Sequence, residues 1–84
     1  MKKITMYSGP LCNFCDAAKR LLLRNNLEFN EIDISTKKEL IDEMIKKANG
    51  RRTIPQIFFD DYHVGGYVEL RELEKSGNLI NLLK

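Results

Sequence analysis

Both cysteines of the 84-residue chain lie in one stretch, Ser8-Gly9-Pro10-Leu11-Cys12-Asn13-Phe14-Cys15. Before it, Met1 to Tyr7 contains β-branched and aromatic residues, which predicts an extended strand. After it, apolar residues recur at helical spacing from Asn13 to Arg24, which predicts a helix. Cys12 is therefore expected at the N-terminus of this helix, with Cys15 one turn further along on the same side.

A helix N-terminus favours the ionised form of a cysteine side chain. The first backbone N–H groups of a helix have no partner within it, and the macrodipole places positive charge at that end. Free cysteine has a pKa of about 8.5, and helix N-termini and Cys-x-x-Cys pairs lower it. We therefore expect Cys12 to attack disulfides as a thiolate, and the deeper Cys15 to resolve the mixed disulfide that forms.

The residues alone leave two other interpretations of the cysteine pair open. A zinc site needs four ligands, and the chain offers only His63 besides the two cysteines. A structural disulfide across so short a loop would constrain the unfolded chain little. A redox-active pair at a strand–helix junction is the favoured interpretation.

Length and composition predict a single domain over residues 1–84. The net charge of +2 is too small to indicate nucleic acid or a membrane as a partner. No apolar run approaches the roughly 20 residues that cross a bilayer, and no signal-peptide core follows Lys2 and Lys3. We therefore expect a monomer in the cytoplasm, where a Cys-x-x-Cys pair is more often catalytic than structural.

The rest of the chain predicts three more strands and three more helical segments. The strands are expected at Leu27–Ile34, Ile54–Phe59 and Tyr62–Val64. One helix is expected to begin at a capping box, Thr36–Glu39, and to run to Ala48. A second is expected at Tyr67–Ser76, and a short helical turn at Leu79–Leu83. This order predicts an α/β fold with a four-stranded mixed sheet: two parallel strands joined by a right-handed crossover, an antiparallel hairpin, and helices on both faces.

The chain resembles the glutaredoxins, and most closely the short dithiol glutaredoxins of bacteria, which have the thioredoxin fold. Three motifs carry the resemblance: Tyr7–Cys15 as strand and active-site loop, Thr53–Gln56 as the family's Thr-Val-Pro segment, and Gly65-Gly66 before the third helix. The resemblance covers nearly the whole chain. It implies a glutathione-dependent oxidoreductase that reduces protein disulfides and protein–glutathione mixed disulfides, with glutathione as the reducing co-substrate and no metal.

The resemblance also implies a glutathione site. A cis Ile54–Pro55 bond would turn the Ile54 backbone toward the cysteinyl part of glutathione, and the Gly66–Val68 turn would take the γ-glutamyl carboxylate. Gln56, helped by Arg51 or Arg52, would meet the glycyl carboxylate. The implied residues are Phe14, Thr53, Ile54, Pro55, Gln56, Gly66, Tyr67, Val68 and Glu69. Phe14 would form an aromatic wall beside Cys12, whereas His63 is expected to be an exposed strand residue.

The chain departs from the family pattern at several positions of this site. Cys12-Asn13-Phe14-Cys15 replaces Cys-Pro-Tyr-Cys, and Gly9 stands where many relatives have a lysine. Val68 and Glu69 stand where the family often has two acidic residues, so that only Glu69 is left to recognise the glutathione amine. We therefore expect weaker selectivity for glutathione than is usual in the family.

Two alternative functions stay open. Glutaredoxins without the active-site proline, as here with Asn13, can hold a [2Fe–2S] cluster between two subunits through the first cysteine and glutathione. A short glutaredoxin-like protein can also be an electron donor that thioredoxin reductase, rather than glutathione, reduces. The reductant supplied to the oxidised protein separates this second alternative from the main interpretation.

Overall fold

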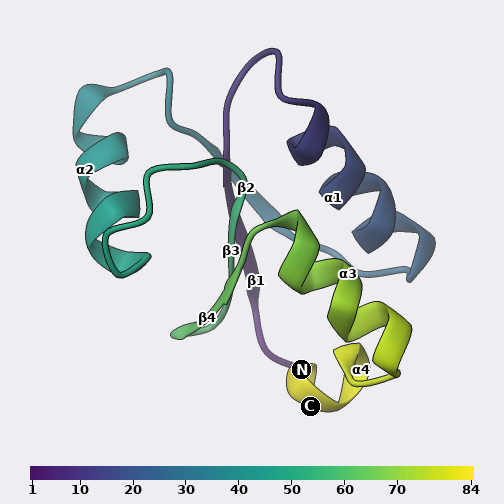
Figure 1. Ribbon diagram of the computed structural model, residues 1–84. Helices are drawn as coiled ribbons and strands as arrows, with labels where there is room; N and C mark the ends of the chain where they lie inside the picture. Colours follow the sequence, from purple (N-terminus) through teal and green to yellow (C-terminus); the bar gives the residue numbers. More distant parts are fainter.

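The computed structural model describes all residues from 1 to 84 (Figure 1). Its strands are β1 (Ile4–Ser8), β2 (Asn30–Asp33), β3 (Gln56–Phe59) and β4 (Tyr62–Gly65). Its helices are α1 (Asn13–Arg24), α2 (Lys38–Lys47), α3 (Tyr67–Ser76) and α4 (Leu79–Leu83). The strands form one sheet in the order β2-β1-β3-β4, in which β1 runs parallel to β2 and antiparallel to β3. The predicted α/β architecture with a mixed four-stranded sheet is confirmed.

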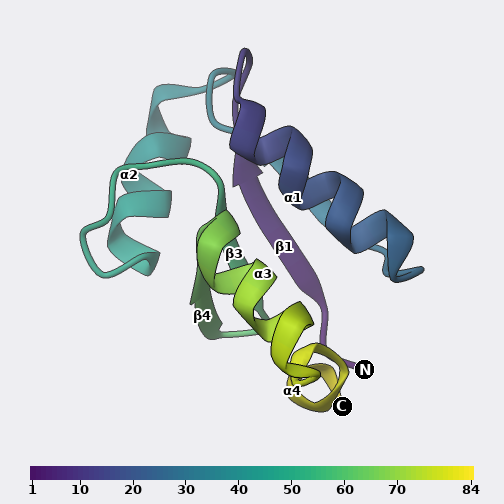
Figure 2. The ribbon, with the colours of Figure 1, turned by 45° about the vertical axis from the view of Figure 1, so that its right-hand side comes forward.

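Helices cover both faces of the sheet, as predicted. Figures 1 and 2 show α1 and α3 on one face and α2 on the other. Because side chains alternate along a strand, Ile57 and Phe59 of β3 belong to the larger core under α1 and α3. Phe58, between them, packs with Met44 in a smaller core under α2. The sheet is therefore buried on both faces, which fixes the strand register.

The helix ends follow local signals, whereas β1, β2 and β3 are shorter than predicted and β4 extends one residue further, to Gly65. Helices α1 and α3 have the predicted bounds, and Gly77 ends α3 in the left-handed conformation with φ 80°. The ladder between β1 and β2 begins only at Asn30, because the N–H of Leu27 bonds to the helix carbonyl of Leu22. Strand β3 begins after Pro55, which has no N–H to donate to a ladder.

The predicted capping box at Thr36–Glu39 is wrong. Helix α2 begins after Lys37, which makes no side-chain cap. The Thr36 hydroxyl donates instead to the carbonyl oxygen of Asp33 at 2.9 Å, and the Asp33 carboxylate accepts the N–H of Ser35 at 2.8 Å. Short polar side chains in a turn compete for the same backbone groups that a helix cap would use, and here the turn prevails.

The two ends of the chain meet at the end of the sheet away from the cysteines (Figure 1). The N–H of Lys2 donates to the carbonyl oxygen of Leu83 at 2.6 Å, and the Lys2 ammonium donates to that of Leu82 at 2.8 Å. None of the four helices is long and apolar enough to pass through a membrane. The opposite end of the sheet is left to the cysteine loop and the N-terminus of α3.

Candidate functional site: a disulfide beside a pocket

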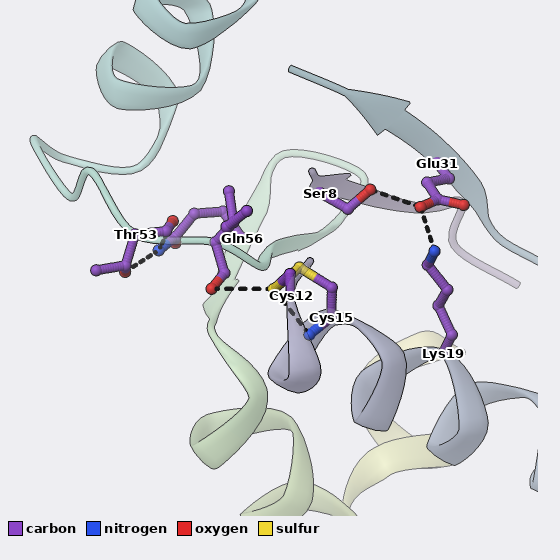
Figure 3. Close-up of a disulfide and its surroundings, with 8 residues drawn as sticks. Ser8, Cys12, Cys15, Lys19, Glu31, Thr53 and Gln56 are labelled. Atoms are coloured by element: carbon purple, nitrogen blue, oxygen red, sulfur yellow. Dashed lines mark hydrogen bonds and ion pairs between the residues drawn. A yellow bond between two sulfur atoms is a disulfide. The ribbon is translucent and has the colours of Figure 1, made fainter. Parts of the chain in front are cut away.

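Cys12 and Cys15 form a disulfide at the start of α1 (Figure 3). Cys12 is the N-cap residue, with extended backbone angles, and its Sγ accepts the backbone N–H of Cys15 at 3.1 Å. Cys12 is half-buried, whereas Cys15 is 1 % exposed. The expected placement of both cysteines is therefore confirmed, and the Cys12 sulfur is the one that an incoming molecule can reach.

The loop before Cys12 packs closely on the Ile54–Pro55 segment. A Cβ atom at Gly9 would lie 3.0 Å from the Cδ1 atom of Ile54, so glycine permits this approach. A side chain at position 9 would therefore require the end of the Ile54 side chain to shift. Leu11 has a φ of 53° and a fully exposed side chain.

The Ile54–Pro55 peptide bond is cis, as the resemblance implied. The carbonyl oxygen of Ile54 lies 3.9 Å from the Sγ atom of Cys12. Ile54 lies two residues before the start of β3, so its backbone is outside the sheet ladder. A backbone segment placed this way can pair with an extended peptide next to the reactive sulfur.

Gln56 is not placed to meet the glycyl carboxylate of glutathione, as the resemblance implied. Its side chain is fully buried, and its Nε2 donates to the carbonyl oxygen of Thr53 at 3.0 Å and to the Thr53 hydroxyl at 3.1 Å. Its Oε1 accepts from His63 Nε2 at 2.7 Å. Every polar atom of the Gln56 amide is thus occupied within the protein, and Gln56 holds Thr53 in place.

His63 is half-buried, so the expectation of an exposed residue is wrong. Its ring stacks on Phe58 with centroids 4.9 Å apart, and burial, with Arg51 nearby, lowers the pKa of the imidazole. The register of the β3–β4 hairpin could have predicted the contact between His63 and Gln56. His63 pairs with Phe58 across the hairpin, and Gln56 lies two residues before Phe58 on the same face.

A pocket of about 220 Å³ lies beside the disulfide. It brings together residues of α1, of the loop before β3 and of the start of α3. The lining residues are Phe14, Arg51, Thr53, Ile54, Pro55, Gly66, Tyr67, Val68 and Glu69. All the predicted glutathione-contacting residues except Gln56 are present, and of the two candidate arginines only Arg51 lines the pocket. A larger hollow of about 800 Å³, between the N-terminal residues and the start of β2, contains neither cysteine.

One wall of the pocket is aromatic and the other is charged. The rings of Phe14 and Tyr67 stack with centroids 6.0 Å apart, and Phe14 is 62 % exposed. Opposite charges meet where Arg51 Nη1 lies 3.2 Å from Glu69 Oε1. The same carboxylate oxygen accepts the N–H of Gly66 at 2.5 Å, and this bond, followed by Arg51, lowers the pKa of Glu69.

A second polar cluster lies on the other side of the disulfide from Thr53 and Gln56 (Figure 3). The buried hydroxyl of Ser8 donates to Glu31 Oε2 at 2.5 Å, and the Lys19 ammonium contacts the same oxygen at 2.5 Å. Lys19, followed by Ser8, lowers the pKa of Glu31. Lys19 of α1 is thus paired with a residue of β2, and the sequence shows no signal for this contact.

Comparison with known proteins gives a consistent result. The glutaredoxin family model matches residues 4–64. A glutaredoxin of Neisseria meningitidis is 40 % identical over 84 residues, covering 99 % of this chain and 98 % of the relative. The solution structure of a Brucella melitensis glutaredoxin has a TM-score of 0.87 and 48 % identity, covering 100 % of this chain and 90 % of that one.

A plant glutaredoxin is similar to this chain in fold alone. The crystal structure of a buckwheat glutaredoxin–glutathione complex has a TM-score of 0.87 at 21 % identity, covering 98 % of this chain and 76 % of that one. The fold, the paired cysteines at a helix N-terminus and the whole-length bacterial relatives agree. The chain belongs to the glutaredoxin family of thiol oxidoreductases.

Proposed function

We propose that residues 1–84 form one glutaredoxin domain that uses glutathione to reduce protein disulfides and protein–glutathione mixed disulfides in the cytoplasm. The observation that carries the proposal is the position of Cys12. Its half-buried sulfur lies at the helix N-terminus, 3.9 Å from the Ile54 carbonyl and beside the pocket, with Cys15 buried behind it. This arrangement exposes one sulfur to substrate and keeps the second within reach of the first.

Removal of glutathione from a client needs only Cys12. Its thiolate attacks the glutathione sulfur of the mixed disulfide, so that a Cys12–glutathione disulfide forms and the client thiolate leaves and takes a proton from water. A second glutathione thiolate then attacks the glutathione sulfur bound to Cys12. Oxidised glutathione leaves, and the Cys12 thiolate returns, stabilised by the N–H of Cys15 and the N-terminus of α1.

Reduction of a client disulfide needs both cysteines. The Cys12 thiolate attacks one client sulfur and forms a mixed disulfide, while the other client sulfur leaves as a thiolate. Cys15 loses its proton and attacks Cys12, which releases the second client thiolate and forms the Cys12–Cys15 disulfide seen in the structure. Two glutathione molecules then reduce this disulfide, each supplying one electron and together forming oxidised glutathione.

The pocket supports glutathione as the small thiol. The Ile54 backbone is placed to pair with the cysteinyl residue, and the backbone N–H groups at the start of α3 attract the γ-glutamyl carboxylate. The Arg51 guanidinium attracts the glycyl carboxylate, and Phe14 with Tyr67 covers the apolar part. That a protein of the same fold was solved with glutathione agrees with this choice.

The test supplies the oxidised protein with one reductant at a time. With glutathione, glutathione reductase and NADPH, we expect steady NADPH consumption in the presence of a glutathionylated peptide. With thioredoxin reductase and NADPH alone, we expect little or none. Turnover only with thioredoxin reductase would reject glutathione as the reductant and favour the electron-donor alternative.

A further inference from the structure

Two large apolar side chains are exposed beside the reactive sulfur. Among the residues within three positions of Cys12 they are those of Leu11, which is fully exposed, and Phe14, which is 62 % exposed. The ring of Phe14 still stacks on that of Tyr67, with centroids 6.0 Å apart. The side chain of Leu11 is covered by no other part of the chain. Packing within the folded protein therefore gives no reason for a leucine at this position.

The backbone conformation of Leu11 suits other residues better than leucine. Pro10 and Leu11 form the turn between β1 and α1, and Leu11 has a φ of 53°. A positive φ in a turn favours glycine or asparagine, because the Cβ atom and a bulky side chain are disfavoured in this conformation. Leucine is thus opposed by the turn geometry and gains nothing from the core. Neither the backbone nor the packing of the protein accounts for Leu11.

We infer that Leu11 is a specificity-determining residue, which contacts the client protein and favours clients with a large apolar side chain next to the reacting cysteine. The inference rests on the proposed function, because it concerns the clients of the same reaction, and it goes further by naming their chemistry. A client sulfur that bonds to Cys12 brings the client residues on either side of it to the loop that contains Leu11. An apolar client side chain there would remove apolar surface of Leu11 from water, which stabilises the complex.

The surroundings of Cys12 place Leu11 beside the client rather than beside glutathione. The carbonyl oxygen of Ile54 lies 3.9 Å from Cys12 Sγ, and its backbone is outside the sheet ladder, so an extended client segment can pair with it. The loop that contains Leu11 packs on the same residue, since a Cβ atom at Gly9 would lie 3.0 Å from Ile54 Cδ1. Leu11 is not one of the residues that line the pocket beside the disulfide. A contact with Leu11 is therefore available to a client segment that extends beyond this pocket.

The experiment measures kcat/KM for two peptide disulfides in the presence of glutathione, glutathione reductase and NADPH. Each consists of two identical short peptides joined through one cysteine, with leucine on both sides of the cysteine in the first and serine in the second. The wild type is compared with Leu11→Asn and Leu23→Asn. Asparagine tolerates a positive φ, and Leu11 has no packing to lose, so Leu11→Asn should fold as the wild type does. Leu23 is the matched control, because it is a 63 % exposed leucine of α1 that does not line the pocket beside the disulfide.

We expect kcat/KM of the wild type to be roughly three- to tenfold higher for the leucine peptide than for the serine peptide. Leu11→Asn should lower this ratio by a factor of about two or more, and Leu23→Asn should keep the wild-type ratio. Equal values for the two peptides in the wild type, or an unchanged ratio in Leu11→Asn, would overturn the inference while leaving the proposed function intact.

Gel filtration tests whether a second copy of the chain covers Leu11 instead of a client. We expect the wild type and Leu11→Asn to elute alike as monomers. A wild-type dimer that becomes a monomer in Leu11→Asn would assign Leu11 to self-association and overturn the inference. If glutathione supports turnover of neither peptide by the wild type, the proposed function is overturned, and the inference with it.

Discussion

The backbone N–H of Cys15 donates a hydrogen bond to the Sγ atom of Cys12 at 3.1 Å. Cys12 is therefore the N-cap of α1 in the way that serine or aspartate usually is, with sulfur in place of oxygen. A negative sulfur accepts such a bond more strongly than a neutral one. The same local geometry thus starts the helix and favours the attacking form of the residue.

Replacing Cys12 and replacing Cys15 should have different effects on the two activities. Cys12→Ser should abolish both activities, because serine cannot form the mixed disulfide. Cys15→Ser should retain removal of glutathione from a peptide and lose reduction of a protein disulfide, because only the second reaction uses Cys15. Steady-state rates with a glutathionylated peptide and with a disulfide-bonded protein give the comparison. Equal loss of both activities in Cys15→Ser would contradict the division of roles.

His63→Ala should destabilise the protein, because it leaves the buried Oε1 of Gln56 without its partner. An unpaired buried acceptor costs about 1–3 kcal/mol in the free energy of unfolding. Urea denaturation measures this loss. Tyr62→Ala is the matched control, because Tyr62 is an exposed neighbour on the same strand. A loss for Tyr62→Ala as large as for His63→Ala would argue against the Gln56 contact.

The His63→Ala variant should also affect the pocket. Gln56 holds Thr53, which lines the pocket next to Ile54, so loosening Gln56 disturbs the segment that faces Cys12. We expect KM for a glutathionylated peptide to rise more than kcat falls. A purely structural role of His63 would instead lower the amount of active enzyme and leave KM as in the wild type.

Acid should weaken the contact between α1 and α3 through Glu74. Arg24 donates two hydrogen bonds to its carboxylate, at 2.9 and 2.7 Å, and with Asn25 lowers the pKa of Glu74 to about 2. A carboxyl with a lowered pKa stabilises the fold above its unfolded pKa of about 4.5, and this contribution is lost as the pH falls toward 2. Glu74→Gln should therefore flatten the dependence of the unfolding free energy on pH between these values.

The control for the acid experiment is Glu72→Gln, since Glu72 is exposed on the same helix and makes no ion pair. Glu31 and Glu69 also have lowered pKa values and act in the same direction, so Glu74→Gln reduces the slope without removing it. A slope identical in the two variants would show that the Arg24–Glu74 pair does not contribute to stability.

Selectivity for glutathione should be weak in the wild-type protein. Val68 replaces one of the two acidic residues that the family often has, and the other, Glu69, contacts Gly66 and Arg51. We expect similar rates with a glutathionylated peptide and with the same peptide carrying a cysteamine disulfide. A large preference for the glutathione adduct would contradict the prediction.

The protein purified without oxygen should be a colourless monomer. A cluster held between two subunits would instead give a brown dimer whose absorbance disappears on exposure to air. Asn13→Pro is the informative variant, because proline fits the first position of α1 and restores the family's loop. A brown wild type with a colourless Asn13→Pro variant would support the cluster alternative, in which Cys12 and glutathione supply the ligands.

Much of the fold could be predicted because its signals are local. The bounds of α1 and α3 follow from apolar spacing and from Gly77, and the position of Cys12 follows from the junction between β1 and α1. The strand ends could not be predicted as well, because a strand extends only where a neighbour offers hydrogen bonds. β2 is an edge strand whose ladder with β1 begins at Asn30, and Leu27 before it bonds to α1 instead.

The sequence by itself determined the fold class, the two roles expected of the cysteines and the segments that form the pocket. Only the tertiary structure decided that Gln56 is buried, that Arg51 rather than Arg52 lines the pocket, and that Lys19 pairs with Glu31. Helix periodicity and turn chemistry act between residues a few positions apart, so they can be read along the chain. The partners of a polar side chain come from segments far apart in the sequence, and packing alone brings those segments together.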